Sequence, residues 1–187
     1  MEDARLWQEV GVTTQLHKTL NMKKITLDEW ELWRHTTSLA EAAEWIEKGF
    51  TPSTAKQWMV HKISPMEATF LTGKLPPEEA AVWLQASIAA DQILLWKAIL
   101  PDAEAAGAFA SKGFTPDKAT EWYDIGATAT EASIFVAGGW NPVTVVNWLH
   151  TNCLKYGDIN KFILPTIGPE MAFEWKRHGF SASEAIQ

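Results

Sequence analysis

Residues 45–58 have the sequence WIEKGFTPSTAKQW, in which two tryptophans stand 13 positions apart with Gly-Phe-Thr-Pro between them. Threonine is a preferred helix N-cap, and proline suits the first helical position because its missing N–H would be unpaired there anyway. Glycine is the usual residue just past a helix end, where the backbone becomes left-handed. The stretch therefore predicts one short helix that ends before Gly49, a tight turn, and a second helix that begins at Pro52.

The same unit recurs from one end of the chain to the other. Residues 109–122, FASKGFTPDKATEW, are a second clear copy, again with an alanine three positions before the closing tryptophan. The large residues that mark the units, here called register residues, stand about 13 positions apart and include nine of the eleven tryptophans. They are Trp7, Leu20, Trp33, Trp45, Trp58, Leu71, Trp83, Trp96, Phe109, Trp122, Phe135, Trp148, Phe162 and Trp175. Self-similarity at a fixed period is the signature of a repeat architecture.

Each unit predicts one helix of about nine residues followed by a turn, and helices this short are only marginally stable by themselves. Their stability must therefore come from packing. The alanine and the register residue three positions later lie on one helix face, so small and large residues alternate along the buried side. We predict an all-α fold of tandem short-helix repeats, about 13 residues per helix-turn unit, packed as an α-solenoid or compact superhelix.

A longer period is superimposed on the short one. Residues 41–52, EAAEWIEKGFTP, recur with changes as residues 104–116 and again as residues 170–181. Five short units therefore make one longer repeat of roughly 64 residues, the size of a small domain. The predicted boundaries are 1–187 for a single helical-repeat domain, with copies of the longer repeat near 41–103 and 104–169 and a partial copy at 170–187.

Two segments depart from the repeat pattern. Residues 153–165 predict a longer loop and a distorted helix. Residues 181–187 start a helix that they do not complete, so we expect either truncation or a missing capping element, which repeat proteins need at their ends.

The composition is that of a soluble globular protein, with 47% hydrophobic and 21% charged residues. No apolar run approaches the roughly 20 residues of a membrane span, and the start of the chain lacks the basic and apolar regions of a signal peptide. The single cysteine, Cys153, excludes an internal disulfide framework. We therefore expect a cytoplasmic protein without a membrane segment.

Nucleic-acid binding is the alternative function, because Trp45, Gly49, Thr51 and Trp58 have the spacing of a helix-turn-helix motif. Two observations disfavour it. The pattern repeats along the whole chain, and the net charge is −7, whereas phosphate contacts supply most non-specific affinity. The basic residues that come nearest to a patch are Lys18, Lys23, Lys24 and Arg34, with glutamates interleaved among them.

Catalytic signals are weak. His150 and Cys153 stand three positions apart with Asp158 downstream, but Cys153 occupies an apolar slot of the repeat, where a small buried residue belongs. The five histidines lack metal-ligand spacing, and no glycine-rich phosphate loop is present. The sequence therefore predicts no enzyme activity, no metal, no cofactor and no small-molecule substrate.

The predicted function is a non-catalytic protein-interaction or scaffold module that binds a partner protein or associates with itself through uncapped ends. The partner would lie along variable positions after the register residues. Those positions include Ile46, Glu47, Lys48, Tyr123, Asp124 and Ile125. The candidate partner-binding residues are Trp140, Trp30 and Tyr123. The two tryptophans lie off the register, where burial is the simpler expectation and exposure would make them interface anchors.

Overall fold

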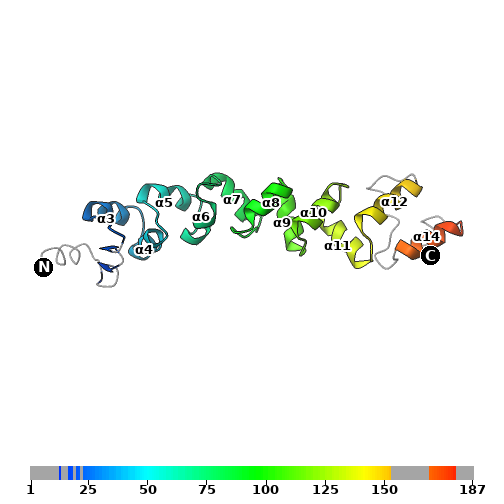
Figure 1. Ribbon diagram of the computed structural model, residues 1–187, viewed down its shortest axis with the longest axis horizontal. Helices are drawn as coiled ribbons and strands as arrows, with labels where there is room; N and C mark the ends of the chain where they lie inside the picture. Colours follow the sequence, from blue (N-terminus) through cyan, green and yellow to red (C-terminus); the bar gives the residue numbers. More distant parts are fainter. Residues whose placement is uncertain (1–12, 14–16, 19, 22, 153–168, 180–187) are drawn as a thin grey trace. The chain divides into compact units, whose positions relative to one another are not determined.

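The computed structural model describes residues 13, 17–18, 20–21, 23–152 and 169–179, which form helices and turns without a strand (Figure 1). This confirms the prediction of an all-α repeat. The helices are α3 (Leu27–Arg34), α4 (Leu39–Glu47), α5 (Pro52–Met59), α6 (Pro65–Leu71), α7 (Pro77–Gln85), α8 (Ile93–Ile99), α9 (Ala103–Ser111), α10 (Pro116–Tyr123), α11 (Ala129–Ala137), α12 (Pro142–Asn152) and α14 (Pro169–Arg177). In this part of the chain, no helix combines the length and apolar character needed to cross a bilayer.

The chain divides into two compact units, the first ending at Val82 and the second beginning at Trp83. In the first unit, α3 contacts α4 and α5, and α5 contacts α6. In the second unit, α8 contacts α9 and α10, α9 contacts α10 and α11, and α10 contacts α11. Each of these helices therefore packs against near neighbours in the chain, as in helical-repeat proteins. The single domain over residues 1–187 stays a prediction.

The core of each unit is built from the register residues, as the sequence predicts. The buried ones are Leu20, Trp33, Trp45, Trp58, Leu71, Trp83, Trp96, Phe109, Trp122, Phe135 and Trp148. The position three residues earlier is also buried and usually holds alanine, for example Ala42, Ala55 and Ala119. Because an alanine beside an aromatic ring leaves space for a ring from the neighbouring helix, the small residues allow these short helices to pack closely.

Most of the helices begin at a hydroxyl cap. Thr26, Ser64 and Thr128 each accept a hydrogen bond from the backbone N–H three residues later, and a glutamate at that position bonds back to the cap. These are complete capping boxes, which satisfy two of the N–H groups that a helix start leaves unpaired. Thr51 and Thr54 form the same box with a second hydroxyl in place of the glutamate.

In the part of the chain that the structure describes, seven helix ends share one hydrogen-bonding pattern. The carbonyl of the register residue accepts a hydrogen bond from the N–H five residues later, and the residue just before that donor has a positive φ. This is the Schellman arrangement, in which the left-handed residue turns the chain out of the helix. The bonded pairs are Leu20–Ile25, Trp45–Phe50, Trp58–Ile63, Trp83–Ile88, Phe109–Phe114, Trp122–Ala127 and Phe135–Trp140.

The two ends with phenylalanine show the accompanying side-chain contact. The rings of Trp45 and Phe50 lie 4.9 Å apart at 88°, and those of Phe109 and Phe114 lie 5.4 Å apart at 89°. Edge-to-face pairs of this kind are favourable beyond the area that they bury. The turn is therefore closed by the backbone and by the rings at the same point.

The spacing of two helix caps bears on how the longer sequence repeat aligns. Ser38 accepts a hydrogen bond from the N–H of Glu41, and Asp102, 64 positions after Ser38, accepts one from the N–H of Ala105. Glu41 therefore corresponds to Ala105 and not, as the sequence pattern indicates, to Glu104. Residues 153–165 and 181–187, for which an irregular segment and an incomplete helix are predicted, lie outside the described residues.

Candidate partner-binding groove

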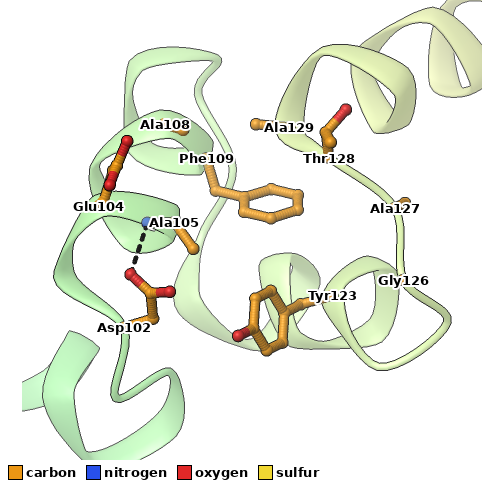
Figure 2. Close-up of a pocket in the computed structure, with 10 residues that line it drawn as sticks. All are labelled: Asp102, Glu104, Ala105, Ala108, Phe109, Tyr123, Gly126, Ala127, Thr128 and Ala129. Atoms are coloured by element: carbon orange, nitrogen blue, oxygen red, sulfur yellow. Dashed lines mark hydrogen bonds between the residues drawn. The ribbon is translucent and has the colours of Figure 1, made fainter.

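An open groove lies in the second unit, between α9 and the turn that joins α10 to α11 (Figure 2). Its volume is about 630 Å³, within the range of known ligand sites. Its lining residues are Asp102, Glu104, Ala105, Ala108, Phe109, Tyr123, Gly126, Ala127, Thr128 and Ala129. We call it the Tyr123 groove.

Two aromatic rings define the apolar part of the groove. Figure 2 shows Phe109 and Tyr123 entering the same space from α9 and from the end of α10. Phe109 is 1% exposed and belongs to the core, whereas Tyr123 is 41% exposed. Around them the groove is lined by the methyl groups of alanines, among them Ala105 and Ala108 on α9. The groove therefore has the buried ring of Phe109 as its floor and the ring of Tyr123 as an accessible contact surface.

The shape of the groove is fixed by backbone hydrogen bonds in the turn. The N–H of Ala127 donates to Trp122 O at 3.0 Å, and Gly126 between them has a φ of +85°. Thr128 then begins α11 with a complete capping box, in which its N–H donates to Glu131 Oε2 at 2.9 Å. Because both helix ends are closed by their own turn, the groove is formed in the free protein.

The charged lining residues of the groove are both acidic. Asp102 caps α9 and accepts a hydrogen bond from the N–H of Ala105 at 3.1 Å, which fixes its carboxylate at the helix start (Figure 2). Glu104, two residues further along the chain, is exposed, and no lysine or arginine lines the groove. The groove thus offers an apolar surface with negative charge at one end, and nothing in this arrangement resembles a nucleophile with its base.

Of the three predicted partner-binding residues, the structure places Tyr123 in the groove and the two tryptophans in the core. Trp30 is fully buried, because it occupies the position that alanine holds in most units. Trp140 is 3% exposed and packs edge-on against Phe135 and Trp148, at ring distances of 6.4 and 6.1 Å. The hypothesis that these indoles act as surface anchors is therefore corrected: anchors need exposed rings.

The other predicted contact positions differ in their exposure to solvent. Ile46 is 1% exposed, because the residue after Trp45 turns toward the core of the first unit, so its predicted surface role is wrong. Glu47 and Lys48, which follow it, are exposed. In the second unit Asp124 is exposed and Ile125 is half-buried, but neither lines the groove. Among these positions, only Tyr123 belongs to the groove.

The four basic residues of the alternative nucleic-acid site, Lys18, Lys23, Lys24 and Arg34, are exposed in the first unit. Two of them have structural partners. Lys23 Nζ donates to the carbonyl of Glu47 at 3.0 Å, at the C-terminal end of α4, where a cation is favourable. Arg34 pairs with Glu31 at 3.2 Å. Nucleic-acid binding stays a prediction.

The weak catalytic pattern involves residues that the structure describes only in part. His150 is exposed near the end of α12, while Cys153 and Asp158 lie outside the described residues. Within the described ranges, no three His, Cys, Asp or Glu side chains gather as metal ligands.

Sequence reasoning missed the α9 wall of the groove, although a signal was present. The position just before the register residue is exposed along the chain and often carries a bulky apolar residue. Examples are Leu32, Phe70, Val82, Leu95 and Ile134. In α9 this position holds Ala108, so the hollow beside Phe109 is wider than a bulky side chain would leave it. A small residue in an exposed slot that is elsewhere bulky could have indicated the groove.

The chain was compared with protein-family models, with curated proteins and with solved structures. None of the three comparisons gave a match.

Proposed function

We propose that this protein is a non-catalytic protein-interaction module and that its second unit holds a short segment of a partner protein in the Tyr123 groove. The observation that carries the proposal is the accessible ring of Tyr123 beside the buried ring of Phe109 in a preformed hollow. Tyrosine is enriched among the residues that dominate binding energy, since it offers a large rigid surface and a polar end.

The lining favours a peptide segment as the ligand. The alanines present methyl groups and few hydrogen-bonding groups, so the contact surface selects apolar side chains rather than a polar metabolite. The groove is also open along one side, which allows a chain to enter and leave it. A single groove is smaller than a standard protein interface, which buries about 800 Å² on each partner, so binding at this groove alone is expected to be weak.

Affinity capture from an extract of the native source tests the proposal when it is made with matched variants. Tyr123→Ala removes the accessible ring, and Val136→Ala is the control because Val136 is exposed on α11 outside the groove. We expect a partner that is retained by the parent protein and by Val136→Ala and is lost with Tyr123→Ala. Equal capture by all three proteins would overturn the assignment of the groove.

A further inference from the structure

A second groove lies in the first unit, beside α4 and the turn between α5 and α6. Its volume is about 540 Å³. Its lining residues are Thr36, Thr37, Glu41, Glu44, Trp45, Met59, Lys62, Ile63, Ser64 and Pro65. We call it the Met59 groove.

The two grooves occupy equivalent positions of the longer repeat. Eight lining residues of the Met59 groove have their counterparts 64 positions later in the Tyr123 groove. The pairs are Glu41–Ala105, Glu44–Ala108, Trp45–Phe109, Met59–Tyr123, Lys62–Gly126, Ile63–Ala127, Ser64–Thr128 and Pro65–Ala129. The same hollow therefore forms twice, once in each unit, because the same helix and turn geometry is encoded twice.

Several features are common to the two copies. Each has a buried aromatic floor, Trp45 or Phe109, and each is also lined by a large side chain from the end of the next helix, half-buried Met59 or exposed Tyr123. Methionine, like tyrosine, suits a contact surface, because its side chain adapts to the shape of a partner. The hydroxyl that begins the next helix, on Ser64 or Thr128, also recurs.

Each groove is also lined by two carboxylates, which stand at non-equivalent positions of the repeat. The Tyr123 groove has Asp102 and Glu104, and the Met59 groove has Glu41 and Glu44. Hydrogen bonds from the hydroxyls of Thr37 and Ser38 hold the pKa of Glu41 below its ordinary value, which favours its ionised form. Both linings therefore carry net negative charge, although Lys62 offsets one of the two carboxylates in the Met59 groove.

We infer that the two grooves are duplicated copies of one peptide-binding subsite, each taking a short partner segment in which an apolar side chain lies next to a lysine or arginine. The inference rests on the proposed function. The apolar side chain would cover the aromatic floor, and the cation would face the carboxylates. Charge complementarity supports this choice of ligand, since the whole chain carries a net charge of −7.

The differences between the copies predict a difference in preference. The Met59 groove has Glu44 where the Tyr123 groove has Ala108, and Lys62 where it has Gly126. The Met59 groove is therefore smaller and more polar, and Lys62 offsets one of its two carboxylates, so its affinity is expected to depend less on the apolar residue of the ligand. The Tyr123 groove is expected to depend more on the apolar residue. A partner with two such segments would gain avidity from one chain.

The test uses the full chain and three synthetic peptides, followed by backbone amide NMR shifts. One peptide alternates arginine and leucine, the second replaces arginine by glutamate, and the third replaces leucine by serine. We expect the Arg-Leu peptide to shift amides lining both grooves, and the other two to bind about tenfold more weakly, a loss near 1.4 kcal/mol. Raising the salt concentration should weaken the Arg-Leu peptide further, because exposed charges are screened.

Matched variants assign the shifts to each groove. Tyr123→Ala should abolish the response of the second unit alone, and Met59→Ala that of the first unit alone. Glu104→Gln and Glu44→Gln remove one exposed carboxylate from each groove without touching a helix cap, and each should weaken binding at its own groove alone. Exchange of the linings by Ala108→Glu and Glu44→Ala should exchange the preferences.

The outcomes separate the two hypotheses. A response in both units, removed groove by groove, supports the inference. A response confined to the second unit, or one indifferent to peptide charge, overturns the inference while the proposed function stands. Capture that is indifferent to Tyr123 overturns the proposed function itself.

Discussion

Gly107 of α9 lies against the backbone of Ala86, so close that a Cβ on the glycine would stand 2.1 Å from the carbonyl oxygen of Ala86. Real Cβ atoms do not approach a carbonyl to this distance, so the contact exists only because glycine has no side chain. This contact positions α9, and α9 also contributes Ala105, Ala108 and Phe109 to the lining of the Tyr123 groove. Packing in the second unit therefore positions one wall of the candidate site.

Gly107→Ala is expected to destabilise the protein by about 1–3 kcal/mol, the usual cost of overpacking, although alanine is the better helix former. Urea denaturation followed by circular dichroism measures the effect. Ala110→Gly is the control in the same helix, and it should cost about 1 kcal/mol through helix propensity alone. Unchanged or increased stability of Gly107→Ala would show that α9 does not approach Ala86 in this way.

Lys62 has a φ of +59° in the same turn position that Gly49 occupies with a φ of +86°. A left-handed backbone costs a residue with a side chain about 1–2 kcal/mol, whereas glycine adopts it freely. Lys62→Gly is therefore expected to stabilise the protein by about 0.5–1 kcal/mol, measured as a higher midpoint of urea denaturation.

Gly49→Ala is the reciprocal change and should lower that midpoint by a similar amount. The strain would be confined to the backbone, because a Cβ at Gly49 meets no atom within 4 Å. Opposite signs for the two variants are required. A stabilising Gly49→Ala would contradict the Schellman geometry.

Trp58→Ala is expected to cost roughly 3–5 kcal/mol, as truncation of a buried aromatic does. The ring is buried at the register position of α5 and leaves a large cavity when it is removed. Lys48→Ala, at an exposed position, should change stability by less than about 0.5 kcal/mol. The comparison of the two unfolding free energies tests whether the register residues form the core.

The carboxylate of Glu41 accepts hydrogen bonds from the hydroxyls of Thr37 and Ser38, which lower its pKa. A lowered pKa in the folded state means that ionised Glu41 contributes stability above its ordinary pKa, and that this contribution is lost as the pH falls through the folded pKa. Thr37→Val should therefore raise the pKa of Glu41, as measured by NMR titration of the side-chain carboxyl. If the pKa of Glu41 is unchanged in this variant, the Thr37 hydroxyl is not the cause of the lowered pKa.

The repeat could be predicted from the sequence because each unit carries its own signals. Gly49, Phe50, Thr51 and Pro52 specify a helix end and a helix start within four residues, and the structure shows both there. The burial of Trp30 could not be predicted in this way, because a tryptophan at an alanine position of the repeat is compatible with either a core residue or an exposed interface anchor. Its burial depends on the space that neighbouring helices leave, which local spacing does not specify.

The groove was harder to foresee than the core. Ala105 and Ala108 are ordinary helix formers, and the hollow that they line depends on the turn between α10 and α11 that lies opposite them. The correspondence between the grooves was also difficult to predict. Alignment of Glu41 with Glu104, which the sequence suggests, is wrong by one residue. The helix caps at Ser38 and Asp102 resolve it.

The hydrogen bond from the N–H of Phe50 to the carbonyl of Trp45 closes a helix within six residues of chain, and it has counterparts at six other helix ends. The backbone hydrogen bonds that close these helix ends therefore lie within each unit's own turn. Whole helix-turn units can therefore be gained or lost during evolution, because each unit brings the hydrogen bonds that close its own turn.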